Sequence, residues 1–113
     1  MREVNRSALI LTAKPAFLDW VREVDASSSD LTLEDINEEP VIYLVPEFES
    51  DEEFAKWVEG HFDDIFQEQL AGWWTDQRLW PTDRSVRLFQ NWFDCQSHSV
   101  VLDVVPGRLS RVE

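Results

Sequence analysis

The sequence has little of what several functional classes require. It contains one cysteine, Cys95, which excludes an internal disulfide and a zinc site built from several cysteines. The apolar run at residues 8–11 is too short for a signal peptide, and no stretch approaches the roughly 18 apolar residues of a membrane span. The sequence also lacks a glycine-rich phosphate loop and a complete catalytic set. We therefore expect a protein of the bacterial cytosol with no cofactor and no membrane association.

Basic residues are also scarce, and the acidic residues that outnumber them are unevenly placed. The chain has 23 Asp and Glu against 10 Lys and Arg, a net charge of −13. Residues 19–68 hold 17 of the acids and only Arg22 and Lys56, which leaves −15 for that region and +2 for the rest. Such a surface repels nucleic acids and anionic membranes. It favours a basic protein partner, or it serves solubility alone.

Apolar residues are plentiful enough for a folded core. They make up 43% of the 113 residues and include six Trp and seven Phe. A chain of this length is typical of one domain and can fold without staples. We therefore expect a single domain over residues 1–113, with residues 106–113 as a loose tail after the Pro106-Gly107 break.

The spacing of apolar residues predicts three strands and about three helices. Short apolar runs that end in turn residues predict strands, and spacings of three and four predict helices. Ser50 and Glu53 form the clearest capping signal of the chain. The predicted strands cover residues 5–12, 41–45 and 97–105. The predicted helices are one from Pro15 to about Asp25, a helical turn over 33–37 capped by Thr32, and a long helix over 51–71. A third helix, capped by Thr82 or Asp83, would have Val86, Phe89, Trp92 and Phe93 on one face.

This order predicts an α+β fold built as a two-layer sandwich. A small three- to four-stranded mixed sheet would carry the helices on one side. A right-handed crossover would make the first two strands parallel, and a very short fourth strand could lie at residues 31–33. The pairing of the last strand cannot be assigned from the sequence.

Cys95 and His98 have the one spacing that resembles a reactive pair. An imidazole can activate a thiolate, and the two side chains could supply two zinc ligands. Neither an orienting group nor two further ligands accompany them. We therefore favour Cys95 as a small buried apolar residue and His98 as a hydrogen-bonded residue at a strand edge, and we predict no metal site.

His61 lies beside Asp63 and Asp64 on the predicted long helix, where it could bind a metal ion in passing. These carboxylates, with Glu59 and Glu68, are more typical of the solvated side of an amphipathic helix. They are also candidates for contact with a basic partner.

The ends of the predicted strands suggest another candidate site. Lys14 follows the first strand and Glu47 follows the second. Ligands of open α/β sheets bind at the carboxyl ends of parallel strands. An antiparallel last strand would bring His98 to the same edge, beside the other two residues.

Trp74 and Trp80 flank a loop that contains Arg78. Exposed aromatic residues with an arginine are typical of interaction hot spots. The alternative, which we favour, is that Trp80 plugs one end of the core.

Three stretches also resemble a known group of proteins: residues 5–20, residues 41–48, and Leu79-Trp80-Pro81 continuing to His98. Together they are similar to a family of small bacterial proteins of about this length, some of which carry a VacJ-like label. The resemblance covers most of the chain and implies no activity. VacJ proteins themselves are outer-membrane lipoproteins with a lipidated cysteine, and the only cysteine here is Cys95.

The sequence therefore predicts a non-enzymatic acidic module that binds a basic protein or has a regulatory role. The contact would use acids such as Glu59, Asp63 and Asp64, or the loop from Trp74 to Trp80. Two alternatives remain open. One is a small ligand-binding protein or enzyme, with its site at the sheet edge near Lys14, Glu47 and His98. The other is a nucleic-acid mimic whose carboxylates occupy a basic cleft.

Overall fold

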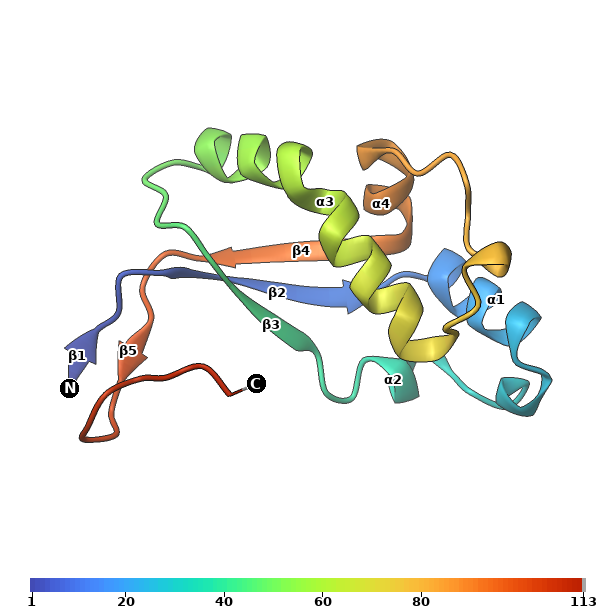
Figure 1. Ribbon diagram of the computed structural model, residues 1–113, viewed down its shortest axis with the longest axis horizontal. Helices are drawn as coiled ribbons and strands as arrows, with labels where there is room; N and C mark the ends of the chain where they lie inside the picture. The colour runs from blue at the N-terminus through green and yellow to red at the C-terminus, as the bar shows by residue number, and fades with distance from the viewer. Residues whose placement is uncertain (113) are drawn as a thin grey trace.

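A three-stranded antiparallel sheet forms the centre of the computed structural model, which describes residues 1–112 (Figure 1). The central strand β2 (Ser7–Ala13) lies between β3 (Val41–Val45) and β4 (Phe93–His98). On one side Leu9 lies opposite Tyr43, and on the other Ala8 lies opposite His98. Both neighbours of β2 are therefore edge strands.

Four α-helices within residues 1–112 complete the α+β fold, which confirms the predicted class. They are α1 (Pro15–Val24), α2 (Leu33–Ile36), α3 (Asp51–Trp73) and α4 (Val86–Trp92). Two short 3-10 helices, η1 (Ala26–Ser28) and η2 (Gln77–Leu79), lie in the connections. In Figure 1, α3 and α4 lie over one face of the sheet, whereas α1 and α2 lie around the end where β2 finishes.

The helix starts are set by side chains close to them in the sequence. The Ser50 hydroxyl accepts from the Glu53 amide, and the Glu53 carboxylate accepts from the Glu49 amide at 2.9 Å. Thr32 caps α2, as predicted. The cap of α4 is Ser85, not Thr82 or Asp83. A 3-10 turn at residues 77–79 and a bend at residues 82–83 come first, so the helix begins only at Val86.

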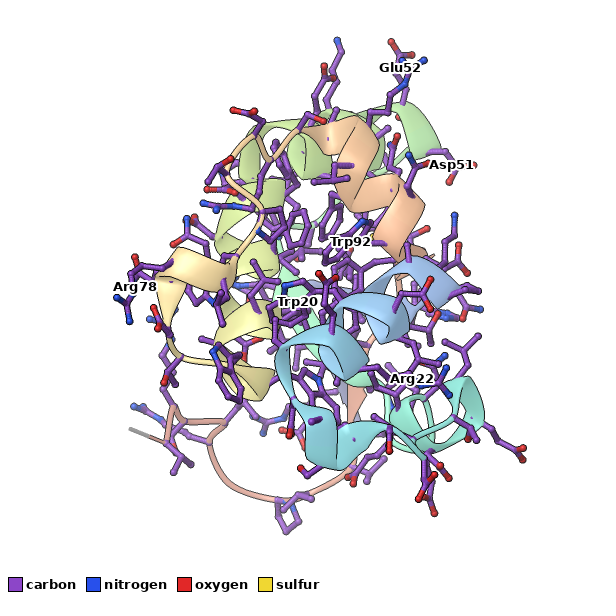
Figure 2. All side chains as sticks on the ribbon, turned by 90° about the vertical axis from the view of Figure 1, so that its right-hand side faces the viewer. Trp20, Arg22, Asp51, Glu52, Arg78 and Trp92 are labelled. Carbon is purple, nitrogen blue, oxygen red and sulfur yellow. The ribbon has the colours of Figure 1, made fainter. Side chains whose placement is uncertain are left out.

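An aromatic cluster joins the helices to the sheet. Phe66 of α3 is fully buried, and its ring lies 5.6 Å from those of Phe89 and Phe93. Phe17 of α1 lies 4.7 Å from Phe93. Figure 2 shows Trp92 within this layer. Because Phe93 contacts both helices, it connects the start of β4 to the core.

The sheet is wholly antiparallel, so the predicted mixed sheet with parallel first strands is wrong in its pairing. Ser7 pairs with Val45 and Leu11 with Val41. A right-handed crossover needs a helix packed over the face of the sheet. Here α1 lies beyond the end of β2 (Figure 1), so the chain turns back and β3 runs antiparallel to β2.

The last strand also begins earlier than predicted. Phe93 is the C-cap of α4 and already the first residue of β4, because its side chain enters the core. The valine-rich residues 100–105 lie beyond the end of β2, where the sheet offers no partner. Instead β5 (Leu102–Asp103) pairs with β1 (Arg2–Glu3) in a separate two-stranded sheet. Residues 31–33 form no strand, because Leu33 begins α2.

Candidate protein-binding surface

One face of the three-stranded sheet carries apolar side chains exposed to solvent. Successive strand residues point to opposite faces, so Leu9 and Tyr43 face the helices while Ile10, Ile42 and Leu44 face away. Ile42 is 60% exposed and Leu44 is 52% exposed. We call these two residues, with Ile10, the open face of the sheet.

The strand that carries most of this face, β3, is also an edge strand. Apart from the ladder to β2, the backbone of Val41–Val45 makes no hydrogen bond within residues 1–112. Alternate residues of such a strand direct their N–H and C=O groups away from the sheet. An edge of this kind is a template for another strand unless something blocks it.

Acidic residues bracket β3 at both ends. Glu38 and Glu39 precede it and Glu47 and Glu49 follow it, and all four are exposed. Pro40 and Pro46 separate the strand from these glutamates. No described residue forms an ion pair with any of the four. The strand is therefore an apolar stretch between two unpaired negative ends.

The helix side of the same edge is polar and acidic. The Tyr43 hydroxyl donates to the exposed carboxylate of Glu68, and Gln69 Nε2 donates to the same hydroxyl at 2.9 Å. Burial and the neighbouring Glu68 raise the pKa of Tyr43, so the phenol stays neutral. Glu68 thus places a third acidic position beside the middle of β3.

The residues expected to share a ligand site are not brought together. Lys14 follows the last residue of β2, and its ammonium donates to the Gln90 carbonyl at 2.8 Å. His98 pairs with Ala8 at the other end of β2, roughly 20 Å of strand away. Glu47 follows β3 at the His98 end, but β3 and β4 lie on opposite sides of β2. Lys14 and Glu47 lie at opposite ends of the sheet because β3 is antiparallel to β2. His98 lies far from Lys14 because it is the last residue of β4 and not near its start.

The side chains of Cys95 and His98 point to opposite faces of β4. Three residues along a strand place two side chains on opposite faces; Cys95 packs against the core, whereas His98 is exposed. Burial and the charge of Asp94 raise the pKa of the Cys95 thiol to about 11, so little thiolate forms at neutral pH. Within residues 1–112, no group of three His, Cys, Asp or Glu side chains is arranged to hold a metal ion.

The acids of α3 have different roles. Arg84 Nε donates to Asp63 at 2.7 Å and holds the pKa of that carboxyl below its ordinary value. Glu59 and Asp64 are exposed. His61 stacks on Trp57 with ring centroids 4.5 Å apart, and its Nδ1 lies 2.8 Å from the Trp57 carbonyl.

The two tryptophans of the loop after α3 are mostly buried. Trp80 is 9% exposed, and its indole N–H donates to the Trp74 carbonyl at 2.7 Å. Trp74 packs against the core. Arg78 projects into solvent (Figure 2), and its only ion-pair partner among the described residues is Asp76. Trp80 therefore plugs one end of the core, and Trp74 is only partly exposed.

The exposure of Ile42 and Leu44 was not predicted from the sequence. Their strand resembles a buried one, because all five residues from Val41 to Val45 are apolar or aromatic. The available signal was the symmetrical bracket of prolines and glutamates, which is unusual for a central strand.

Comparison with protein-family models, with functionally described proteins and with solved structures gives no match. Among residues 1–112, no helix is both long enough and apolar enough to cross a membrane.

Proposed function

We propose that this protein is a non-enzymatic binding module of the bacterial cytosol that recognises a basic protein partner through its acidic surface. The observation that carries the proposal is the uncompensated charge of residues 19–68. Of the 17 acids in this region, all but Asp25 and Asp63 are exposed. Of these 17 acids, only Asp63 has an ion-pair partner within residues 1–112.

Such a surface attracts a basic partner over a distance of about one Debye length, roughly 8–10 Å at physiological salt. The attraction raises the association rate and discriminates against acidic partners. The same charge destabilises the domain by self-repulsion, and a bound basic partner would relieve that repulsion. A regulatory role would follow if the partner's own basic surface is a functional site.

The test is capture of partners from bacterial extract on the immobilised domain, with elution by rising salt. The comparison is a variant in which Glu38, Glu39, Glu47 and Glu49 are all changed to Gln. A basic protein that elutes early in the salt ladder and is reduced on the variant supports the proposal. Capture of no basic protein at low salt, or capture that salt does not weaken, contradicts it.

A further inference from the structure

We infer that the partner binds by adding a strand to the free edge of β3, and that the added segment has apolar residues in its middle and basic residues at its ends. This inference rests on the proposed function and names where and how the partner binds. Three observations carry it: the unpaired backbone edge of Val41–Val45, the exposed side chains of Ile42 and Leu44, and the glutamates at both ends of the strand.

The two faces of β3 specify the side chains of the added strand. Main-chain hydrogen bonds supply affinity in strand addition, and alternate side chains supply specificity. On the open face, the neighbours are Ile42 and Leu44, so apolar residues fit there. On the helix side the neighbours are Tyr43 and Glu68, so a lysine or arginine fits at the central position. Basic residues at the two ends lie beside Glu39 and Glu47.

A second copy of this chain fits poorly on the same edge. Antiparallel pairing of two β3 strands about Tyr43 would place Glu39 of each copy opposite Glu47 of the other. Like charges directly opposite each other on paired strands are destabilising. The glutamates therefore oppose self-association and favour a partner of opposite charge.

The C-terminal segment of the chain is a candidate competitor for the same edge, because it is basic. Residues 108–112 contain Arg108 and Arg111 and have no regular secondary structure. Residues 107–111 and Leu44 line one cavity of about 740 Å³, so the tail passes close to β3 (Figure 1). A chain that ends at Gly107 removes this competitor and belongs in the test.

The first experiment measures binding of a nine-residue probe peptide, Lys-Thr-Val-Val-Lys-Val-Val-Thr-Lys, by fluorescence anisotropy. Its sequence is the same in both directions, so it fits either strand orientation. The Glu39→Lys/Glu47→Lys variant should bind it roughly tenfold or more weakly. The matched control Asp19→Lys/Glu23→Lys has the same net charge, with both changes at exposed residues of α1, and should lose less than about threefold. A peptide with glutamate in place of each lysine should not bind.

The second experiment separates strand addition from charge attraction. N-methylation removes the backbone donors of alternate peptide residues, and only one of the two alternating sets faces β3 in an added strand. Methylation of one set should abolish binding, whereas methylation of the other should leave it within about threefold. Equal effects of the two sets overturn the inference.

The outcomes distinguish this inference from the proposed function. If the peptide binds but both charge variants weaken it equally, the acidic surface binds basic chains and β3 is not the site. If the peptide binds only the chain that ends at Gly107, the tail is the native occupant and the inference of an external partner is overturned. If neither chain binds the peptide or any basic protein, the proposed function also fails.

Discussion

The open face of the sheet makes a direct prediction about stability. Ile42 and Leu44 are 60% and 52% exposed, so about half of each side chain is buried. Full burial of an aliphatic side chain stabilises a protein by about 1.5–3 kcal/mol, so each contributes roughly 1 kcal/mol. Threonine has the branched Cβ that strands favour. The Ile42→Thr/Leu44→Thr double variant should therefore lose only about 1–1.5 kcal/mol of unfolding free energy.

The comparison variant is Leu9→Ala, on the opposite face of the same sheet. Leu9 is fully buried beneath the helices, and such a truncation costs about 2–5 kcal/mol. Urea unfolding, followed by tryptophan fluorescence, gives both values with the slope as a check on two-state behaviour. If the double variant loses as much as Leu9→Ala, the open face is covered in solution, and the argument for a free binding surface fails.

Three further predictions concern other parts of the fold. The Asn37 side chain bonds both the N–H and the C=O of Ala13, at 2.7 and 2.9 Å, so Asn37→Ala should cost about 1–3 kcal/mol in urea unfolding; a cost near zero would contradict this pairing. The hydrogen bond from Arg84 lowers the pKa of Asp63 in the folded protein. The ionised carboxylate therefore stabilises the fold fully above the ordinary carboxyl pKa, and this stabilisation is lost as the pH falls through the lowered pKa of the folded state. The stability difference between wild type and Asp63→Asn should therefore persist from about pH 8 to 5 and fade below about pH 3; a difference that is independent of pH would contradict the ion pair. Because the pKa of Cys95 is about 11 and the thiol is half-buried, iodoacetamide at pH 7.5 should alkylate the folded protein roughly 100-fold more slowly than the urea-unfolded chain; similar rates would refute the burial.

Local signals predicted most of the elements. Ser50 followed by acids, and apolar residues at spacings of three and four, indicated the long helix that the structure shows as α3. Pro15 marked the start of α1. Thr32 marked α2, where it forms a capping box with Asp35. These features depend on residues within about four positions of one another, so the sequence specifies them.

Pairing depended on contacts that no local pattern contains. The position of α1 at the end of the sheet reversed the expected direction of β3. The early start of β4 depended on where Phe93 enters the aromatic core. The expected ligand site relied on parallel first strands. In the antiparallel sheet, Lys14 and Glu47 lie at opposite ends instead.

The candidate surface could be predicted only in part for the same reason. The acidic excess of residues 19–68 and the bracket of Glu39 and Glu47 are visible in the sequence. Whether Val41–Val45 is a central or an edge strand is a property of the sheet order. That order decides whether Ile42 and Leu44 belong to the core or to a binding surface.

Backbone hydrogen exchange of β3, with and without the probe peptide, tests the central claim most directly. The account predicts that the amides of Val41–Val45 that point away from β2 exchange quickly in the free protein and become protected, in alternation, when the peptide binds. Protection of those amides in the free monomer would show that the edge is already occupied. Peptide binding that protects α3 and leaves β3 unchanged would place the site elsewhere and contradict strand addition.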